Sequence, residues 1–195
     1  PLVGLLPSIC ALRDEIQHKM QYPEPVRIGA GGGIGTPAAV LGAFSMGAAY
    51  VVTGSINQAC QEASTSPAVK QALAQAGAPD VMMAPSADMF EMGVKVQVLK
   101  RGTMFPMRSQ KLYDVYQSCG SIEAIPPDLR SELEEKIFQR SLDAVWNECL
   151  RFFSERDPGQ LEKARANPKK KMALVFRWYL GLATHWAIQG LPDRK

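Results

Sequence analysis

Several features that would identify common kinds of protein are absent from this sequence of 195 residues. No apolar run approaches the roughly 20 residues that a membrane-spanning helix requires, and the first residues lack the basic region of a secretory signal peptide. The formal net charge of +3 is too small to indicate a nucleic-acid-binding protein. Hydrophobic residues make up 46% of the chain, which is ordinary for a globular protein, so we expect a soluble cytoplasmic protein.

Cysteine is also scarce, and its spacing excludes the usual cysteine-based sites. The four cysteines are far apart and form neither a CxxC pair nor a spacing typical of metal ligands. We therefore expect no metal site, and we expect free buried thiols rather than disulfides in a cytoplasmic protein. These residues are Cys10, Cys60, Cys119 and Cys149.

The most informative stretch is the glycine-rich segment at residues 27–37, which has the pattern of a strand that ends in glycines and turns into a helix. Glycines adopt positive φ and allow an anion to approach the backbone closely. The first amides of a helix supply free donors and a favourable dipole. A second glycine turn follows one helix later. The candidate phosphate-binding residues are Gly31, Gly32 and Gly33 in the first turn and Gly54 and Ser55 in the second.

The residues between the two turns predict one βαβ unit. Thr36 has the character of an N-cap and Pro37 that of a first helical residue, while Gly47 is a plausible stop. Residues 48–53 read as a parallel strand that is buried on both faces, because the apolar run shows no polar alternation. Two strands do not make a stable sheet alone. Since the sequence starts at Pro1 rather than at Met, we expect it to be a piece of a longer protein.

The remaining pattern is wholly helical from Ser66 onward, so the predicted fold class is α/β with an all-helical extension. We expect two domains: residues 1–65, the last βαβ unit of a (β/α)8 barrel with one helix before it, and residues 66–195, a helical extension. The expected helices span residues 8–20, 67–76, 88–100, 106–119, 127–153, 160–166 and 171–188.

Three interpretations of the glycine turns compete. Residues 33–38 formally match the dinucleotide fingerprint, but a Rossmann fold needs an acidic residue about 20 positions further on, where this chain has Thr53, Gly54 and Ser55. A (β/α)8 barrel instead binds phosphate with the loops after its seventh and eighth strands. The third interpretation is that the glycines only let the helix pack closely on the strand. We favour the barrel.

Three longer motifs carry a family resemblance. The segments at residues 53–58, 88–100 and 167–179, together with the glycine turns, resemble the PfaD-type trans-acting enoyl reductases of polyketide and polyunsaturated fatty acid synthases. This family is among the nitronate monooxygenase-like flavoproteins. The resemblance covers nearly the whole chain.

The resemblance implies a barrel flavoprotein that takes hydride from NADPH onto FMN and delivers it to the enoyl thioester of an acyl carrier protein within a synthase complex. Carried over, Gly32, Gly33, Gly54 and Ser55 would hold the FMN phosphate. We name no catalytic acid, because the first six βα units of the family would precede Pro1; this chain alone is expected to be inactive. Nitronate oxidation and a non-catalytic docking module are the alternatives, and homo-oligomer formation stays open.

Three further features have two interpretations each. The lysine run at residues 169–171 is either solvated or meets a carrier protein or NADPH. We interpret His18 as solvated and His185 as a packed core or interface histidine. Asp88 and Glu91 read as charges at a helix N-terminus. A methionine-rich stripe is either core filler or the lining of an acyl tunnel; its members are Met82, Met83, Met89, Met92, Val96 and Leu99.

Overall fold

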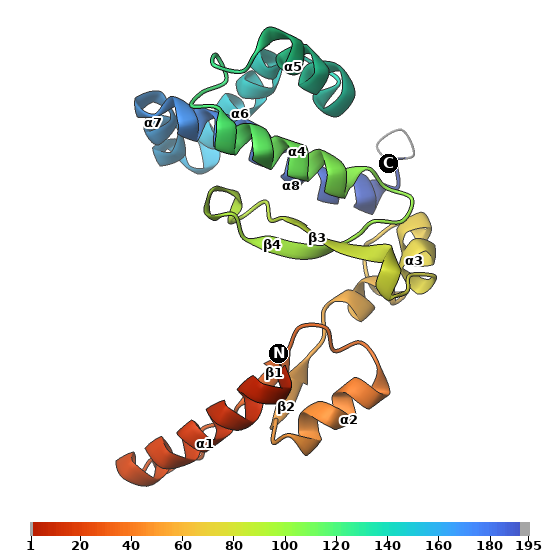
Figure 1. Ribbon diagram of the computed structural model, residues 1–195, viewed down its shortest axis with the longest axis vertical. Coiled ribbons are helices and arrows are strands. Elements are labelled where there is room, and N and C mark those ends of the chain that lie inside the picture. Colours follow the sequence, from red (N-terminus) through yellow and green to blue (C-terminus); the bar gives the residue numbers. More distant parts are fainter. Residues whose placement is uncertain (1, 192–195) are drawn as a thin grey trace. The chain divides into compact units, whose positions relative to one another are not determined.

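The computed structural model describes residues 2–191 and forms two compact units, one up to Ser64 and the other from Thr65 onward (Figure 1). We call the first the α/β unit and the second the helical unit. Within the described residues, no helix is both long and apolar enough to cross a membrane.

The α/β unit contains the predicted βαβ arrangement. Strands β1 and β2 pair in parallel, with Gly29 opposite Tyr50 and Gly31 opposite Val52. The hydroxyl of Thr36 accepts a hydrogen bond from Ala39 N at 3.2 Å and so caps α2 as expected. The elements are α1 (Leu2–Met20), β1 (Gly29–Gly31), α2 (Pro37–Ser45), β2 (Tyr50–Val52) and the 3-10 helix η1 (Ser55–Ala59).

The core of the α/β unit is small and built mainly from alanine, which lets the helices approach the strands closely. It consists of Leu6, Ala30, Ile34, Ala43 and Ala48. The prediction that the second strand is buried on both faces was wrong for this structure: two of its side chains are about half exposed, because no described element covers them. These side chains are Tyr50 and Val52, which are 50% and 59% exposed.

The first helix begins earlier than the sequence indicated. We expected residues 8–20 with Ser8 as N-cap, but α1 begins at Leu2, contains Pro7, and has the Ser8 hydroxyl donating to Gly4 O at 2.9 Å. Leu6 is only 3% exposed in the core of the unit. Burial of this side chain offsets the helix-interrupting effect of the proline, which removes one backbone donor.

The helical unit is not wholly helical, because the predicted helix at residues 88–100 is wrong. Strands β3 (Val81–Pro85) and β4 (Lys95–Leu99) form an antiparallel hairpin, with Ala84 opposite Val96. Gly93 adopts φ +71 in the turn between them and ends the 3-10 helix η3 (Phe90–Met92). The alternation in Lys95–Leu99 is a strand signal that we missed. Figure 1 shows the hairpin beside α4 (Phe105–Ser118), against which β3 packs.

The predicted long helix at residues 127–153 is interrupted. A π-helical stretch, η4 (Leu133–Phe138), follows α5 (Pro127–Glu132), and Gln139 then takes φ 57. Ser141 begins α6 (Leu142–Arg156) as its N-cap, since its hydroxyl accepts from Ala144 N at 3.2 Å.

The remaining helices were predicted with small errors at their ends. α4 confirms the expected helix at residues 106–119. The others are α3 (Pro67–Ala74), α7 (Pro158–Ala166) and α8 (Pro168–Gln189), and the short 3-10 helix η2 (Ala78–Asp80) was not predicted. α8 begins three residues before the predicted start because Asn167 caps it, accepting from Lys169 N at 2.9 Å.

The core of the helical unit surrounds α8, which packs against α4, α6 and α7. Phe176 is fully buried on α8, and its ring lies 6.4 Å, edge to face, from that of Phe90 in η3. The turn between β3 and β4 is therefore held to the last helix by aromatic packing. Other fully buried members are Leu112, Leu133, Leu142, Cys149, Met172, Ala173 and Val175.

Candidate functional site

The two glycine turns follow the carboxyl ends of neighbouring parallel strands. Gly31, the last residue of β1, lies opposite Val52, the last residue of β2. The residues that continue from these two positions therefore leave the sheet at the same edge and at the same level. This edge is where ligands bind in α/β proteins with parallel strands.

The first turn has a backbone that requires glycine. Gly32 and Gly33 take φ values of +89 and +70, which side chains other than glycine rarely tolerate. Ile34 follows with 6% exposure and packs in the core of the unit, so the turn is held at its far end. The shape of this turn thus follows from two consecutive glycines and one apolar contact.

The second turn is held by side-chain hydrogen bonds rather than by unusual backbone angles. Asn57 Nδ2 donates to Thr53 O at 3.0 Å, and the Thr53 hydroxyl lies 3.1 Å from Asn57 Oδ1. The backbone N–H of Asn57 also donates to Gly54 O at 3.0 Å. Asn57 therefore positions Gly54 and Ser55. We did not assign it this role from sequence, although it stands in the family motif at residues 53–58.

The structure brings the two turns to one cavity of about 230 Å³. A Cβ placed on Gly35 would lie 3.3 Å from Ile56 Cγ2. The chain after the first glycine turn and the chain after the second are therefore nearly in contact at these two residues. Four of the five predicted site residues line the cavity, while Gly31 ends β1 and is not part of the lining. The lining residues are Gly32, Gly33, Ile34, Val52, Thr53, Gly54 and Ser55.

The cavity offers backbone donors instead of charged side chains. Within residues 2–191, the backbone N–H groups of Gly32, Gly33, Gly54 and Ser55 donate to no protein acceptor. A Cβ on Gly32, Gly33 or Gly54 would meet no atom within 4 Å, and Gly54 has an ordinary φ of −122. Packing in this unit therefore does not require glycine at position 54. The open space above these amides fits a phosphate group that approaches the main chain closely.

The size of the cavity limits what it can hold. Sites for whole drug-sized ligands have volumes of about 300–1,000 Å³, whereas this cavity has about 230 Å³. The two turns can therefore enclose the phosphate end of a mononucleotide, and the ring system of such a ligand would extend beyond them.

The lysine run at residues 169–171 is neither solvated nor available to a partner. Lys169 Nζ donates to the carbonyl oxygens of Tyr116 and Cys119 at the end of α4, the latter at 2.7 Å. Lys170 pairs with Glu91 at 2.5 Å and Lys171 with Glu123 at 2.9 Å. All three ammonium groups are therefore used within the helical unit, and the interpretation as a docking run is wrong.

Two other predicted roles also change. Glu91 lies in the first turn of the short 3-10 helix η3 rather than near the start of the long helix that we expected. It accepts from Lys170, with Arg177 Nη1 at 3.6 Å. His185 is exposed and so is not part of the core of the helical unit, and His18 is exposed as expected. Neither histidine lines the cavity between the glycine turns.

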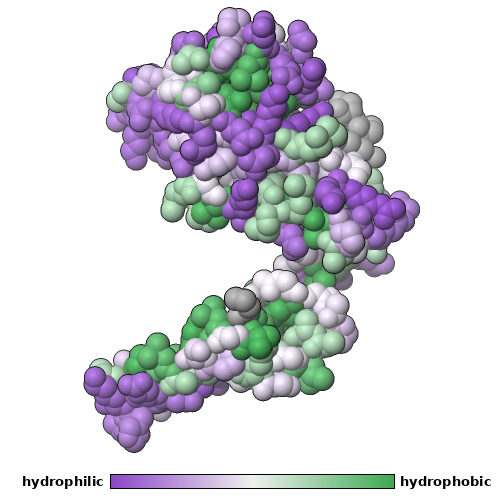
Figure 2. All heavy atoms as spheres, viewed as in Figure 1, coloured by the Kyte–Doolittle hydropathy of each residue, from purple (hydrophilic) through white to green (hydrophobic). Residues whose placement is uncertain are grey.

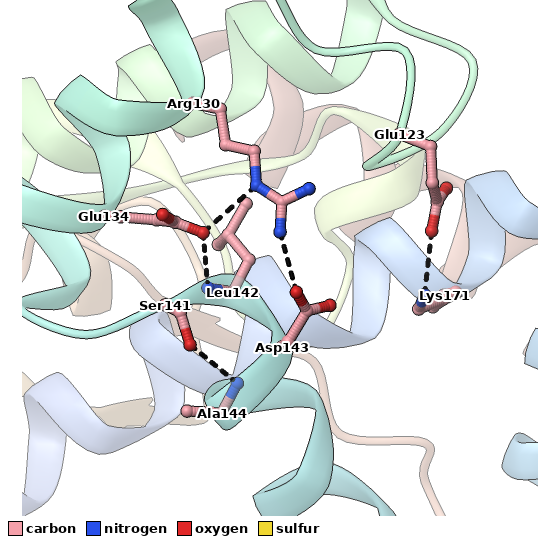
Figure 3. Close-up of polar contacts among 8 residues, drawn as sticks. All are labelled: Glu123, Arg130, Glu134, Ser141, Leu142, Asp143, Ala144 and Lys171. Carbon is pink, nitrogen blue, oxygen red and sulfur yellow. Dashed lines mark hydrogen bonds and ion pairs between the residues drawn. The ribbon is translucent and has the colours of Figure 1, made fainter. Parts of the chain in front are cut away.

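A network of hydrogen bonds and ion pairs connects α5, η4 and α6 (Figure 3). Arg130 Nε donates to Glu134 Oε1 at 3.1 Å, and Arg130 Nη2 donates to Asp143 at 2.9 Å. The same Glu134 oxygen accepts from Leu142 N at 2.8 Å at the start of α6. The two carboxylates raise the pKa of Arg130, chiefly through the hydrogen bond to Glu134. Since α5, η4 and α6 meet here, the network is structural.

The thiols differ in exposure, so the expectation of four buried cysteines was wrong. Cys149 is fully buried, Cys60 is exposed, and Cys10 and Cys119 are intermediate. Burial raises the pKa of the Cys149 thiol to about 12. This thiol stays protonated and unreactive at neutral pH.

The α/β unit thus consists of parallel strands that end in two glycine turns around one cavity. Comparison with known proteins adds the biological setting. The chain is 48% identical to a polyunsaturated fatty acid synthase subunit of Thraustochytrium sp., over 100% of this chain and 13% of that protein. It is 47% identical to polyketide biosynthesis protein PksE of Bacillus subtilis, over 98% of this chain and 25% of that protein. The chain thus spans a quarter or less of these relatives.

Among solved structures, the chain matches the enoyl reductase domain of MlnA from the macrolactin biosynthesis cluster of Bacillus amyloliquefaciens. The TM-score is 0.90 at 42% identity, over 98% of this chain and 43% of that one. Residues 119–195 also match the family described as acyl-carrier-protein S-malonyltransferase, inserted helical domain. The chain is homologous to parts of polyketide and polyunsaturated fatty acid biosynthesis proteins, and it shares its fold with part of an enoyl reductase domain.

Proposed function

We propose that this chain is part of a PfaD-type, FMN-dependent enoyl reductase of polyketide or polyunsaturated fatty acid biosynthesis. The observation that carries the proposal is the match, over nearly the whole chain, to the enoyl reductase domain of MlnA. The relatives named as synthase and polyketide biosynthesis proteins support the same pathway class.

The cavity between the glycine turns is the proposed site for the FMN phosphate. The amides of Gly32 and Gly33 from one side and those of Gly54 and Ser55 from the other would donate to the phosphate oxygens. Hydrogen bonds to a charged acceptor are stronger than neutral ones, so a dianion bound by several amides needs no arginine. When bound, FMN would supply the redox chemistry by taking hydride from NADPH and passing it to the β-carbon of the enoyl thioester.

The α/β unit is proposed to be part of a (β/α)8 barrel. In support, its two strands are parallel, are joined through α2, and end in the paired turns that such barrels use for phosphate. Large apolar side chains also face outward from the unit, as green spheres in Figure 2 show. In a barrel, further strands and helices would cover them. The most exposed are Val3, Leu5, Leu12, Met20, Leu41 and Val52, between 54% and 74% exposed.

Reduction of an enoyl thioester also requires a proton for the α-carbon, and among the residues that the structure describes no histidine lies at the cavity to donate it. The two histidines of the chain are exposed and do not line the cavity. We therefore assign this chain a binding and positioning role within the enzyme. The proposed partners are NADPH and an acyl carrier protein that bears the enoyl thioester.

The proposal is tested with the full-length protein. Purification should yield a yellow protein with one bound FMN, and NADPH oxidation should be stimulated by a crotonyl thioester but not by the saturated butyryl thioester. A flavoprotein that ignores crotonyl thioesters and oxidises alkyl nitronates with oxygen would replace this proposal with nitronate oxidation. A colourless protein that does not oxidise NADPH but binds synthase proteins would indicate a docking module.

A further inference from the structure

The two glycine turns are held in different ways, and the second lacks the supports of the first. In the first turn, Gly32 and Gly33 take positive φ values, and buried Ile34 anchors the end of the turn. In the second turn, the 3-10 helix η1 contains no buried residue, and Ile56 is 46% exposed. Apolar burial therefore does not hold the chain that follows β2.

Side-chain hydrogen bonds between Thr53 and Asn57 take the place of that support. The Thr53 hydroxyl lies 3.1 Å from Asn57 Oδ1, and Asn57 Nδ2 donates to Thr53 O at 3.0 Å. The segment between these two residues consists of Gly54, Ser55 and Ile56, so its two ends are tied together. The backbone N–H of Asn57 adds a hydrogen bond to Gly54 O at 3.0 Å. We call Thr53 and Asn57 the second-turn clamp.

The chemistry of the second-turn clamp requires asparagine at position 57. A carbonyl oxygen can only accept a hydrogen bond, so the amide nitrogen of Asn57 must face Thr53 O. The amide oxygen then faces the Thr53 hydroxyl, and because this oxygen also only accepts, the hydroxyl must donate its one hydrogen to it. Aspartate at this position would lack the donor, and alanine would lack both groups.

The same hydrogen bond removes the Thr53 hydroxyl from the donors that the cavity offers. Thr53 belongs to the cavity lining, where a hydroxyl group could donate to a phosphate oxygen. Its one hydrogen is already directed to Asn57 Oδ1. The donors on this side of the cavity are therefore the backbone N–H groups of Gly54 and Ser55, which lie between the two residues of the clamp.

Holding these two amides in advance favours binding of an anion. A loop that orders itself only on binding loses part of its interaction energy to conformational entropy, whereas a preorganised loop does not. Hydrogen bonds also weaken steeply when donor and acceptor are poorly aligned. Since no residue of η1 is buried, the second-turn clamp is what keeps the amides of Gly54 and Ser55 in the wall of the cavity.

We propose that the second-turn clamp sets the preference of this site for FMN over riboflavin, which is the same flavin without the phosphate. The inference rests on the proposed function, in which the two turns hold the FMN phosphate. Thr53 and Asn57 are positioning residues, because their side chains keep two backbone donors in place and do not donate to the ligand. The ring system of the flavin would extend beyond the turns, so the clamp affects binding of the phosphate and not that of the ring.

The experiment measures the dissociation constants of FMN and of riboflavin with the flavin-free full-length protein, by fluorescence quenching. Asn57→Ala should weaken FMN binding by about tenfold, which corresponds to about 1.4 kcal/mol and to the loss of one or two hydrogen bonds. Riboflavin binding should not change. Thr53→Val deletes the hydroxyl but keeps the shape of the side chain, and it should weaken FMN binding by a smaller factor. Thr53→Ser keeps the hydroxyl and should bind FMN as the wild type does.

A double-mutant cycle separates positioning from direct contact with the phosphate. If the Thr53 hydroxyl acts only through Asn57, Thr53→Val should have no further effect on FMN affinity once Asn57→Ala is present. Equal effects of Thr53→Val in both backgrounds would make the hydroxyl a direct ligand and overturn the clamp. Asn147→Ala, at an exposed position on α6 in the helical unit, is the matched control and should leave the affinities for both flavins unchanged.

Two other results would overturn the clamp while leaving the proposed function intact, since the wild type would still bind FMN. The first is an equal loss of FMN and riboflavin affinity in Asn57→Ala and Thr53→Val, which would show that the pair supports the fold or contacts the ring. The second is unchanged FMN affinity in Asn57→Ala, which would show that the turn keeps its shape without the side chain. A wild-type protein that binds neither flavin, or binds both equally well, would instead contradict the proposed phosphate site, and the clamp with it.

Discussion

The ammonium group of Lys170 lies 2.5 Å from Oε1 of Glu91 and joins the first turn of α8 to η3 in the hairpin. Both side chains are less than one-third exposed, and Arg177 approaches the same oxygen at 3.6 Å. The pair therefore connects two segments that are far apart in sequence. It also holds the turn that carries Met89 and Met92.

Removing this ion pair should destabilise the helical unit moderately. Lys170→Met keeps the aliphatic chain and deletes the charge, and we expect a loss of about 1–2 kcal/mol in the free energy of unfolding, because Glu91 keeps Arg177 as a partner. Urea unfolding monitored by tryptophan fluorescence measures the change. Lys163→Met, at an exposed position on α7, is the matched control and should have little effect.

Gly54→Ala tests the phosphate site with the least disturbance of the fold. Position 54 has a negative φ of −122, and a new Cβ would meet no atom within 4 Å, so the thermal stability of the flavin-free protein should change little. FMN affinity, measured by fluorescence quenching with the full-length protein, should fall by at least about tenfold if a phosphate contacts this backbone. Gly33→Ala is less informative, because φ +70 strains any side chain there.

The control for this experiment is Gly120→Ala. A Cβ on Gly120 also meets no atom within 4 Å, but this residue is in the helical unit. Its FMN affinity should equal that of the wild type. Unchanged affinity in Gly54→Ala would remove Gly54 from the phosphate site.

Gly93 should be much less tolerant than Gly102, although both have φ +71. A Cβ on Gly93 would overlap the Tyr113 hydroxyl, whereas one on Gly102 would meet no atom within 4 Å. We expect Gly102→Ala to cost about 1–2 kcal/mol from backbone strain alone. Gly93→Ala should cost about 1–3 kcal/mol more, because the Tyr113 ring packs against Phe90 and cannot move freely. Equal melting temperatures for the two variants would contradict the contact.

The pair of Glu123 and Lys171 should contribute stability that depends on pH. The hydrogen bond from Lys171 lowers the pKa of Glu123 from 4.5 to about 2. A carboxyl group with a lowered pKa stabilises the folded state above its ordinary pKa, and this contribution is lost as the pH falls through the folded value. The Glu123 side chain is 60% exposed, so we expect less than about 1 kcal/mol at neutral pH.

Urea unfolding of the wild type and Glu123→Gln at several pH values measures this contribution. The difference between the two proteins should be largest at neutral pH and should shrink between pH 4.5 and about 2. Glu135→Gln, which removes an exposed carboxylate outside any ion pair of the described chain, is the control. A difference that did not vary with pH would show that the ion pair is not formed.

The exposed and buried cysteines should react at very different rates. Cys60 is exposed, so iodoacetamide at pH 8 should modify it in the folded protein. Cys149 should be modified only after urea is added, because it is fully buried and its pKa is raised to about 12. Mass spectrometry of peptides identifies the modified residues. The Cys60→Ser variant should lose the rapid reaction, and rapid modification of Cys149 would contradict its burial.

Local sequence signals predicted the elements that depend on local chemistry. Thr36 followed by Pro37 located the start of α2, and the glycines before it located the first turn. The two parallel strands and their order also followed from the apolar runs between glycine turns. These signals are local, because backbone conformation and helix capping depend on residues only a few positions apart in the chain.

The errors occurred where distant packing overrides local preference. The segment at residues 88–100 has apolar residues at helical spacing, yet it forms a turn and a strand because β4 pairs with β3 and Phe90 is buried against α8. The lysine run looked solvated, but its three ammonium groups contact four residues from other segments: Tyr116, Cys119, Glu91 and Glu123. The strand pairing and the lysine contacts both involve residues far away in the sequence, so neighbouring residues do not indicate them.

By itself, the sequence determined the two glycine turns. In the first turn, only glycine readily allows the positive φ angles at positions 32 and 33, and in the second, local hydrogen bonds between Thr53 and Asn57 hold the backbone. Tertiary structure alone decided that both turns line one cavity, since this depends on the register in which Gly31 lies opposite Val52. It alone also decided which polar and apolar side chains are exposed, because folding pairs the lysines of residues 169–171 internally and leaves the methionines of the hairpin outside the core.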